Sequence, residues 1–329
     1  MQFSDRLLKW HKKYGRHDLP WQKTSDPFLI WASEIMLQQT QVITVIPYYL
    51  TFLEKFPTAH DLAMTPLTDF LSFWSGLGYY QRAKNMHRCA QAIMNQHQGQ
   101  MPEQYEQLLS LPGIGPSTAA AIMAQAFEKP YAILDGNVKR VLSRVYALSL
   151  CIDQSEGTLE LWSLANQNMP SHDCRRYTQA IMDLGAMICK KKPQCDLCPM
   201  AGICEGFKKD QQNNLPIRKK KKRAITWPMS FHVYQNTHGE YALVQRVNEG
   251  IWQDLLCFPP TGSNGLQTIT QTHLLTHRKL EISYEILDTE PEEVTHWLTK
   301  KQLLKSAIPN ALRKVIDEIE LTINTGDNP

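Results

Sequence analysis

The chain has 329 residues, of which 43% are hydrophobic and 20% are charged, and its formal net charge is +3. A single hydrophobic core rarely grows to this length, so two domains are expected, and the apolar content is ordinary for a globular protein. No apolar run is long enough to cross a bilayer, which excludes a protein built on membrane-spanning helices.

The first predicted element is an amphipathic helix in MQFSDRLLKWHKKYG, where charged residues lie among Leu7, Leu8 and Trp10. A secretory signal needs an uninterrupted apolar stretch, which this segment lacks. We therefore expect a soluble, cytoplasmic protein in a reducing compartment, where disulfides do not form.

Apolar residues at three- and four-residue spacing predict helices through the first two thirds of the chain. These helices are expected over 28–39, 45–56, 85–95, 105–111, 117–127, 137–148 and 175–188. Prolines between positions 47 and 130 lie mostly near the expected helix starts and turns.

Glu34 lies inside one of these apolar runs, IWASEIMLQQTQV. Burial would raise the pKa of its carboxyl group, and a neutral glutamic acid near physiological pH can act as a general acid. The same pattern also suits a glutamate at the polar edge of an amphipathic helix. Periodicity alone leaves both interpretations open.

Residues 105–127, YEQLLSLPGIGPSTAAAIMAQAF, place LPGIG between two helical segments. Gly113 and Gly115 permit a tight turn, and Pro116 suits the first turn of the following helix. Backbone amides at such a helix start can bind a phosphate, so this pattern indicates a helix-hairpin-helix that grips the DNA backbone. A purely structural helix corner would use the same glycines.

Asp135, in AILDGNVKRVLSRVY, directly precedes a predicted helix and therefore suits an N-cap. A capping aspartate is favoured in its ionised form by the helix dipole, so it could also face a developing cation. Capping and a functional role are compatible.

Four cysteines fall within residues 189–204, CKKKPQCDLCPMAGIC. Thiolates on one compact loop favour a [4Fe–4S] cluster, with one cysteine for each iron, and zinc is the alternative. The ligands would be Cys189, Cys195, Cys198 and Cys204. The lysines at 190–192 could meet phosphates.

A basic linker is expected over 208–223, after the helical region, which we place at 1–207. Residues 190–223 hold eleven Lys or Arg against three Asp or Glu, which suggests a nucleic acid partner or a solvated connection. Beyond it, FHVYQ, YALVQRV and KLEISYEIL predict strands, and short helices are expected over 291–299 and 309–320.

Several of these stretches together resemble the adenine DNA glycosylases of the MutY type, in the endonuclease III superfamily. They are SEIMLQQTQVITVIPYY, GLGYYQRAKNMH, LPGIGPSTAAAI, ILDGNVKRV, MDLGAMIC, the cysteine loop, GIWQDLLCFPP and HLLTHRKLEI. The resemblance implies a multi-domain protein: an all-α glycosylase domain of two helical lobes, with helix-hairpin-helix and iron–sulfur loop, and an α+β Nudix-like domain over 224–322. It further implies a monomer that binds duplex DNA and associates with the nucleoid.

The resemblance also implies a reaction, the removal of adenine paired with 8-oxoguanine or guanine. Glu34 would be the general acid and Asp135 the stabiliser of the sugar cation, with Asn137 and Asp183 as pocket residues. Gln38 and Tyr79 would approach the duplex and fill the gap left by the extruded base.

Four features of the sequence bear on the function that the resemblance implies. Ser117 stands where lyase members of the superfamily carry a Schiff-base lysine, so the resemblance implies a monofunctional glycosylase. The family's Phe-Ser-His motif reads Leu275-Thr276-His277, which keeps Thr276 and His277 for reading 8-oxoguanine. The first cysteine spacing is one residue short, and the acidic Nudix hydrolase signature is missing.

Two other functions stay open at this point. One is an endonuclease III-like glycosylase and lyase acting on oxidised pyrimidines, against which Ser117 argues. The other is a non-catalytic iron–sulfur protein that binds DNA without releasing a base.

Overall fold

The computed structural model describes residues 2–220, 224–247, 250–261, 271–275 and 278–325. The chain divides into two compact units. Residues 1–64 and 85–220 form the first unit, and residues 65–84 and 221–329 form the second. In the described residues, no helix is both long and apolar enough to cross a membrane.

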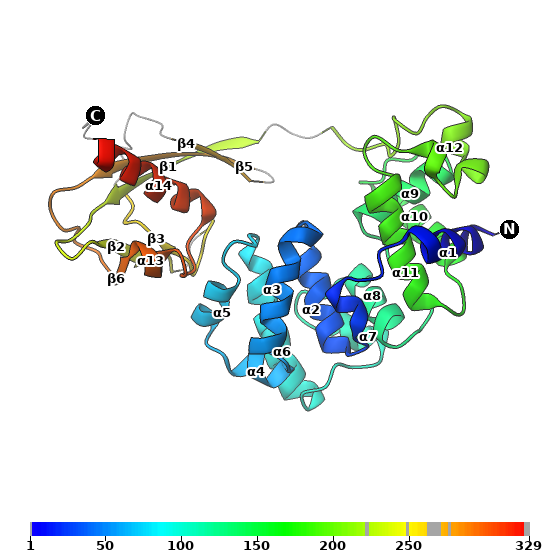
Figure 1. Cartoon of the computed structure of the whole chain (residues 1–329), viewed down its shortest axis with the longest axis horizontal. Helices are drawn as coiled ribbons and strands as arrows, with labels where there is room; N and C mark the ends of the chain where they lie inside the picture. Colours follow the sequence, from blue (N-terminus) through cyan, green and yellow to red (C-terminus); the bar gives the residue numbers. More distant parts are fainter. Residues whose placement is uncertain (1, 221–223, 248–249, 262–270, 276–277, 326–329) are drawn as a thin grey trace. The chain divides into compact units, whose positions relative to one another are not determined.

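The first unit is helical (Figure 1). Its α-helices and its turns of 3-10 or π type are α1 (Phe3–Tyr14), η1 (Pro20–Lys23), α2 (Pro27–Leu37), α3 (Val42–Lys55), α4 (Ala59–Met64), most of α6 (Tyr80–His97), α7 (Tyr105–Ser110), α8 (Pro116–Ala126), α9 (Gly136–Val145), α10 (Ser155–Asn168), α11 (Cys174–Asp183), η2 (Leu184–Ile188), η3 (Cys195–Leu197), η4 (Ala201–Ile203) and α12 (Glu205–Lys208). Every helix expected from apolar spacing in this region is present.

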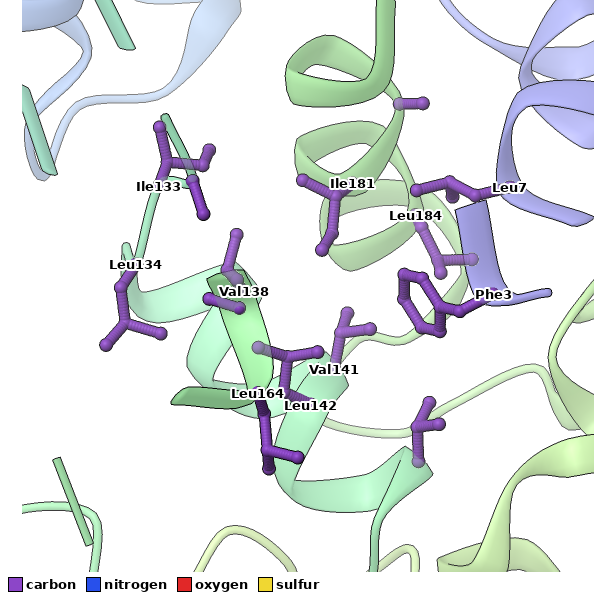
Figure 2. Packing of buried hydrophobic residues seen from close by; sticks show 14 of the residues in the cluster. Phe3, Leu7, Ile133, Leu134, Val138, Val141, Leu142, Leu164, Ile181 and Leu184 are labelled. Atoms are coloured by element: carbon purple, nitrogen blue, oxygen red, sulfur yellow. The ribbon is translucent and has the colours of Figure 1, made fainter. Parts of the chain in front are cut away.

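One group of helices packs around a continuous apolar core. Phe3 and Leu7 of α1 meet residues of α9, α10 and α11 there (Figure 2). The α9 residues Val138, Val141 and Leu142 follow helical spacing and are almost completely buried. Burying each such side chain contributes about 1.5–3 kcal/mol. This core fixes the position of α9 within the unit.

A second group of helices joins the first through α8. Within it, α2 packs on η1 and α3, and aromatic rings such as Phe28 and Phe52, with centroids 5.9 Å apart, fill the space between α2 and α3. The helix α8 contacts α2, α7 and α11. Alanines dominate α8, and their small side chains let helices approach from both sides.

The second unit contains two three-stranded sheets. In one, β5 (Arg278–Ile286) lies between β1 (Ile225–Val233), which is parallel to it, and β4 (Gln271–Leu274), which is antiparallel. In the other, β2 (Glu240–Gln245) lies between β3 (Leu256–Cys257) and β6 (His296–Thr299), both antiparallel. The strands expected near 231, 241 and 279 are thus confirmed.

The remaining helices of this unit are α5 (Leu67–Phe73), α13 (Lys300–Leu303) and α14 (Asn310–Thr325). Residues of α14 bury against the sheets, which confirms the helix expected over 309–320. The helix expected over 291–299 is wrong, because His296–Thr299 form β6. Pairing with β2 satisfies the backbone there, and this tertiary contact overrides local propensity.

Candidate active site

One cavity in the first unit gathers residues from elements far apart in the sequence. Its volume is about 730 Å³, and it is lined by α2 and the loop after it, by the starts of α8 and α9, and by α11 and η2. The residues selected from sequence that line it are Glu34, Gln38, Ser117, Asp135 and Asn137. A deep cavity with convergent ionisable groups is the candidate active site.

Glu34 lies on α2 and lines this cavity. Gln125 of α8, itself buried, donates a hydrogen bond from Nε2 to Glu34 Oε1 at 2.7 Å. The pKa of Glu34 is raised to about 7, mainly by burial and also by the nearby charge of Asp135. The hydrogen bond from Gln125 acts in the opposite direction and lowers the pKa. Glu34 is only partly accessible to solvent. This favours the interpretation of Glu34 as a buried acid over a glutamate at the polar edge of an amphipathic helix.

Asp135 is the N-cap residue of α9, as its position in the sequence predicts. Its Oδ1 accepts a hydrogen bond from Val138 N at 2.7 Å, and its Oδ2 accepts one from Asn137 Nδ2 at 3.2 Å. Burial raises the pKa of Asp135, while these hydrogen bonds and the charge of Arg140 oppose the rise. The start of α9 therefore supports a carboxylate at the cavity wall.

Arg140 lines the cavity one helical turn beyond Asn137. Its Nη2 donates to Asn137 Oδ1 at 2.9 Å and to Gly185 O at 2.7 Å, and its Nε donates to Cys189 O at 2.7 Å. Asn137 is thus held between the carboxylate of Asp135 and the guanidinium of Arg140. This chain of hydrogen bonds fixes the direction of the Asp135 carboxylate.

Asp183, expected as a pocket residue, is fully buried at the end of α11. Arg16 donates to it from Nε at 2.9 Å, from Nη2 at 2.6 Å and from its backbone N at 2.7 Å, and Gln179 donates from Nε2 at 2.8 Å. Burial alone would raise the pKa of Asp183, but the hydrogen bonds from His11 and Arg16 hold it below its usual value. Asp183 itself does not line the cavity. Its partners Arg16 and Gln179 do, and the hydrogen bonds to Asp183 hold both in place.

Two carboxyl groups with different environments therefore share one cavity. The pKa of Glu34 is about 7, so this residue can hold a proton near neutral pH. Burial also raises the pKa of Asp135, and the hydrogen bonds from Val138 N and Asn137 Nδ2 oppose that rise. A pair of carboxyl groups in one cavity suits the cleavage of a glycosidic bond, in which one group protonates the leaving group and the other stabilises the sugar cation.

The turn between α7 and α8 adjoins this cavity. Gly113 has φ +79°, and a Cβ added there would lie 2.7 Å from Asn85 Cβ, so glycine is required. Gly115, the N-cap of α8, has open space where a Cβ would be, and no side chain caps this helix start. Ser117 Oγ accepts a hydrogen bond from Leu134 N at 3.1 Å, which connects the hairpin to the segment just before Asp135.

The four cysteines of the loop after η2 line one small pocket of about 20 Å³. None of the eight cysteines forms a disulfide. The pKa of Cys198 is raised to about 12, mainly by burial and to a smaller extent by the other three thiols of the loop. Among the described residues, no group of three or more His, Cys, Asp or Glu side chains has the arrangement of a metal-ion site.

The chemistry of this pocket nevertheless suits a multi-iron cluster, whose ligands lie around several irons rather than one ion. Arg144, only 3% exposed, donates from Nη1 to Cys189 Sγ at 3.3 Å and to Lys190 O at 2.6 Å, and from Nη2 to Lys191 O at 3.1 Å. Hydrogen bonds from surrounding groups of this kind orient the ligands of a metal centre. The same contacts leave Lys190, Lys191 and Lys192 exposed.

The residues expected to meet the duplex fall in different units. Gln38 is the C-cap of α2 and lines the active-site cavity. Tyr79 belongs to the second unit, is 48% exposed and has φ +48°. It lines a second cavity, of about 620 Å³, together with Trp252, Leu275 and Arg278. The predicted 8-oxoguanine readers at positions 276 and 277 lie outside the described residues.

Four site residues were not found from the sequence. Gln125 had a detectable feature, since it is a polar residue inside an apolar helical run, as Glu34 is. Arg140 and Arg144 stand one and two turns after Asn137, but an exposed helix face has the same spacing. Nothing in the sequence around Arg16 indicates its contact with Asp183.

Known proteins that resemble this chain are DNA glycosylases. The profile of the HhH-GPD superfamily base excision DNA repair proteins matches residues 32–167. A protein of Buchnera aphidicola subsp. Baizongia pistaciae described as adenine DNA glycosylase is 39% identical over 258 residues, 78% of this chain and 73% of the relative. The human adenine DNA glycosylase is 37% identical over 223 residues, 65% of this chain and 41% of the relative.

Solved structures share the helical fold. A thermostable thymine-DNA glycosylase matches with a TM-score of 0.58 at 32% identity, over 63% of this chain and 95% of its own. An endonuclease III in a non-covalent DNA complex matches with a TM-score of 0.55 at 24% identity, over 64% and 95% of the two chains. The second likeness shows the fold alone.

Proposed function

Because this chain belongs to the adenine DNA glycosylase family and is a DNA glycosylase of base excision repair, we propose that it removes adenine paired with 8-oxoguanine or guanine in duplex DNA. The product is an abasic site, and the protein acts as a monomer. The observation that carries this proposal is the pair formed by Glu34, with its pKa of about 7, and Asp135 in one cavity.

The reaction needs a proton for the base and a negative charge for the sugar. Glu34 donates its proton to N7 of the extruded adenine, so that the base leaves as a neutral molecule. Asp135, oriented by Asn137 and the start of α9, stabilises the oxocarbenium-like sugar until water attacks it. Asp183 supports the pocket wall through Arg16.

Ser117 supports a monofunctional enzyme, because a hydroxyl group cannot form the Schiff base that strand cleavage requires. The amides near Gly113 and Gly115 bind a phosphate of the duplex. Gln38 and Tyr79 occupy the gap that the flipped adenine leaves. The second unit is a Nudix-like domain in which Thr276 and His277 read 8-oxoguanine, and the cavity beside Tyr79 and Leu275 supports this role.

The base-release assay is the experiment that tests this function. Purified protein should release adenine from duplexes with adenine opposite 8-oxoguanine or guanine, and should leave adenine opposite thymine intact. Borohydride added during the reaction should trap no covalent DNA adduct. Release of oxidised thymine with a trapped adduct would support the lyase alternative, and duplex binding without release of any base would support the non-catalytic one.

Cys189, Cys195, Cys198 and Cys204 are the proposed ligands of a [4Fe–4S] cluster, with Arg144 as a donor to the first. The cluster would stiffen the loop that carries the exposed lysines at 190–192 toward the DNA backbone.

We expect purified protein to be brown, with about four iron and about four sulfide per chain. Elemental analysis and acid-labile sulfide assay measure both. Replacing Cys198 by Ser should lower the iron content, whereas replacing Cys89, a buried cysteine outside the loop, should not. Colourless protein with one zinc per chain would contradict the cluster.

A further inference from the structure

Arg218 opens the basic run RKKKKR but does not lie free in a linker. It lines the active-site cavity, together with Glu34, Asp135 and Arg140. Its charge is also among the influences that lower the pKa of Arg140, of which burial is the largest. The first cation of the run therefore lies at the same cavity as the two carboxyl groups.

The backbone around Arg218 is anchored on both sides. Ile152 N donates to Ile217 O at 3.0 Å, and Lys219 N donates to Asp153 Oδ2 at 3.2 Å. The turn before α10 thus holds residues 217–219 against the helical unit. Arg218 has a fixed place at the cavity, in contrast to an arginine in a free linker.

The guanidinium of Arg218 differs from the other two in the cavity lining. Arg140 uses its donors on Asn137 and on backbone carbonyls, and Arg16 uses Nε and Nη2 on Asp183. Arg218 has one ionic partner among the described residues, Asp153, with Nη1 3.7 Å from Oδ1, and its side chain is 52% exposed. This half-exposed guanidinium is therefore accessible to a ligand.

We propose that Arg218 binds a backbone phosphate of the DNA strand beside the nucleotide that enters the cavity. The inference rests on the proposed function, since a nucleotide with its base in the cavity carries its flanking phosphates at the mouth. A guanidinium matches a phosphate with two parallel hydrogen bonds. Its charge also offsets the repulsion between those phosphates and the carboxylate of Asp135.

Binding to a duplex with a stable abasic-site analogue (tetrahydrofuran) opposite 8-oxoguanine tests the proposal. We expect Arg218→Gln to weaken this binding about tenfold and to reduce the slope of log affinity against log salt by about one. The matched control is Lys220→Gln, which removes the same charge from an exposed residue two positions on. Its affinity should fall less than threefold. Equal losses for the two variants, or none for Arg218→Gln, would overturn the proposal.

A second arm identifies the phosphate. Single phosphates around the abasic analogue are replaced in turn by neutral methylphosphonate. At one position, the methylphosphonate should weaken binding by the wild-type protein but not by Arg218→Gln. The variant has already lost the contact between Arg218 and that phosphate. Additive losses at every position would contradict a direct contact. Both arms measure binding, so they remain decisive even if the wild-type protein released no adenine and the proposed function failed.

Discussion

Glu34→Gln is expected to lower the single-turnover rate of adenine release about 10³-fold while duplex affinity stays within about threefold of the wild type. The variant keeps the size of the side chain and can still accept the hydrogen bond from Gln125. It loses only the acidic proton, and without that proton adenine must leave as an anion. Quenched-flow measurement of base release at saturating enzyme, on adenine opposite 8-oxoguanine, separates this loss from binding.

Glu54→Gln is the matched control, because Glu54 is an exposed glutamate on the neighbouring helix α3 and does not line the cavity. Its rate should equal the wild-type rate. If Glu34→Gln also released adenine at the wild-type rate, Glu34 would not be the acid.

The pH dependence of the wild-type rate follows from the same two carboxyl groups. Glu34 must be protonated, so the rate should fall as pH rises through about 7. Asp135 must be ionised, and burial raises its pKa, so the rate should also fall on the acid side. The resulting bell-shaped profile reports the pair rather than either residue alone.

Glu34 also affects stability, with a defined sign. Its folded pKa of about 7 lies above the ordinary value of 4.5, so its contribution is fully present below pH 4.5 and is lost as pH rises through 7. Glu34→Gln avoids that loss. At pH 8.5 the variant should be more stable than the wild type by about 2 kcal/mol, a figure reduced for partial solvent access. Thermal unfolding at pH 5.5 and 8.5 should show this gap widening with pH.

Asp135→Asn is expected to slow adenine release about 10²- to 10³-fold without lowering the melting temperature. Asparagine caps a helix about as well as aspartate, so the start of α9 should persist. The change removes the negative charge that we propose to face the sugar cation, and in that mechanism the transition state alone depends on this charge. Single-turnover rates and thermal unfolding of the same preparation distinguish catalysis from folding.

Asp26→Asn provides the control for capping. Asp26 caps α2 by accepting hydrogen bonds from Phe28 N at 2.8 Å and Leu29 N at 3.4 Å, and it is not part of the cavity lining. Both variants make the same chemical change at an N-cap. A loss of rate in Asp26→Asn as large as in Asp135→Asn would mean that capping, rather than charge at the sugar, explains the effect.

Features that depend on near neighbours could be predicted from the sequence. Helix positions follow from apolar spacing, the cap at Asp135 depends on Val138 three residues away, and the hairpin turn depends on Gly113. The motifs also carried the resemblance that the comparisons bear out. These features can be predicted from the sequence because all the atoms involved lie within one or two helical turns of each other along the chain.

Properties that depend on residues far apart in the sequence became visible in the folded structure. The pKa of Glu34 rises because distant residues bury it, and its partner Gln125 is 91 positions away. Arg16 and Asp183 meet across 167 positions, and β6 is a strand because β2 pairs with it. Desolvation and strand pairing depend on which segments the folded chain brings together, and periodicity along one segment contains no information about that choice.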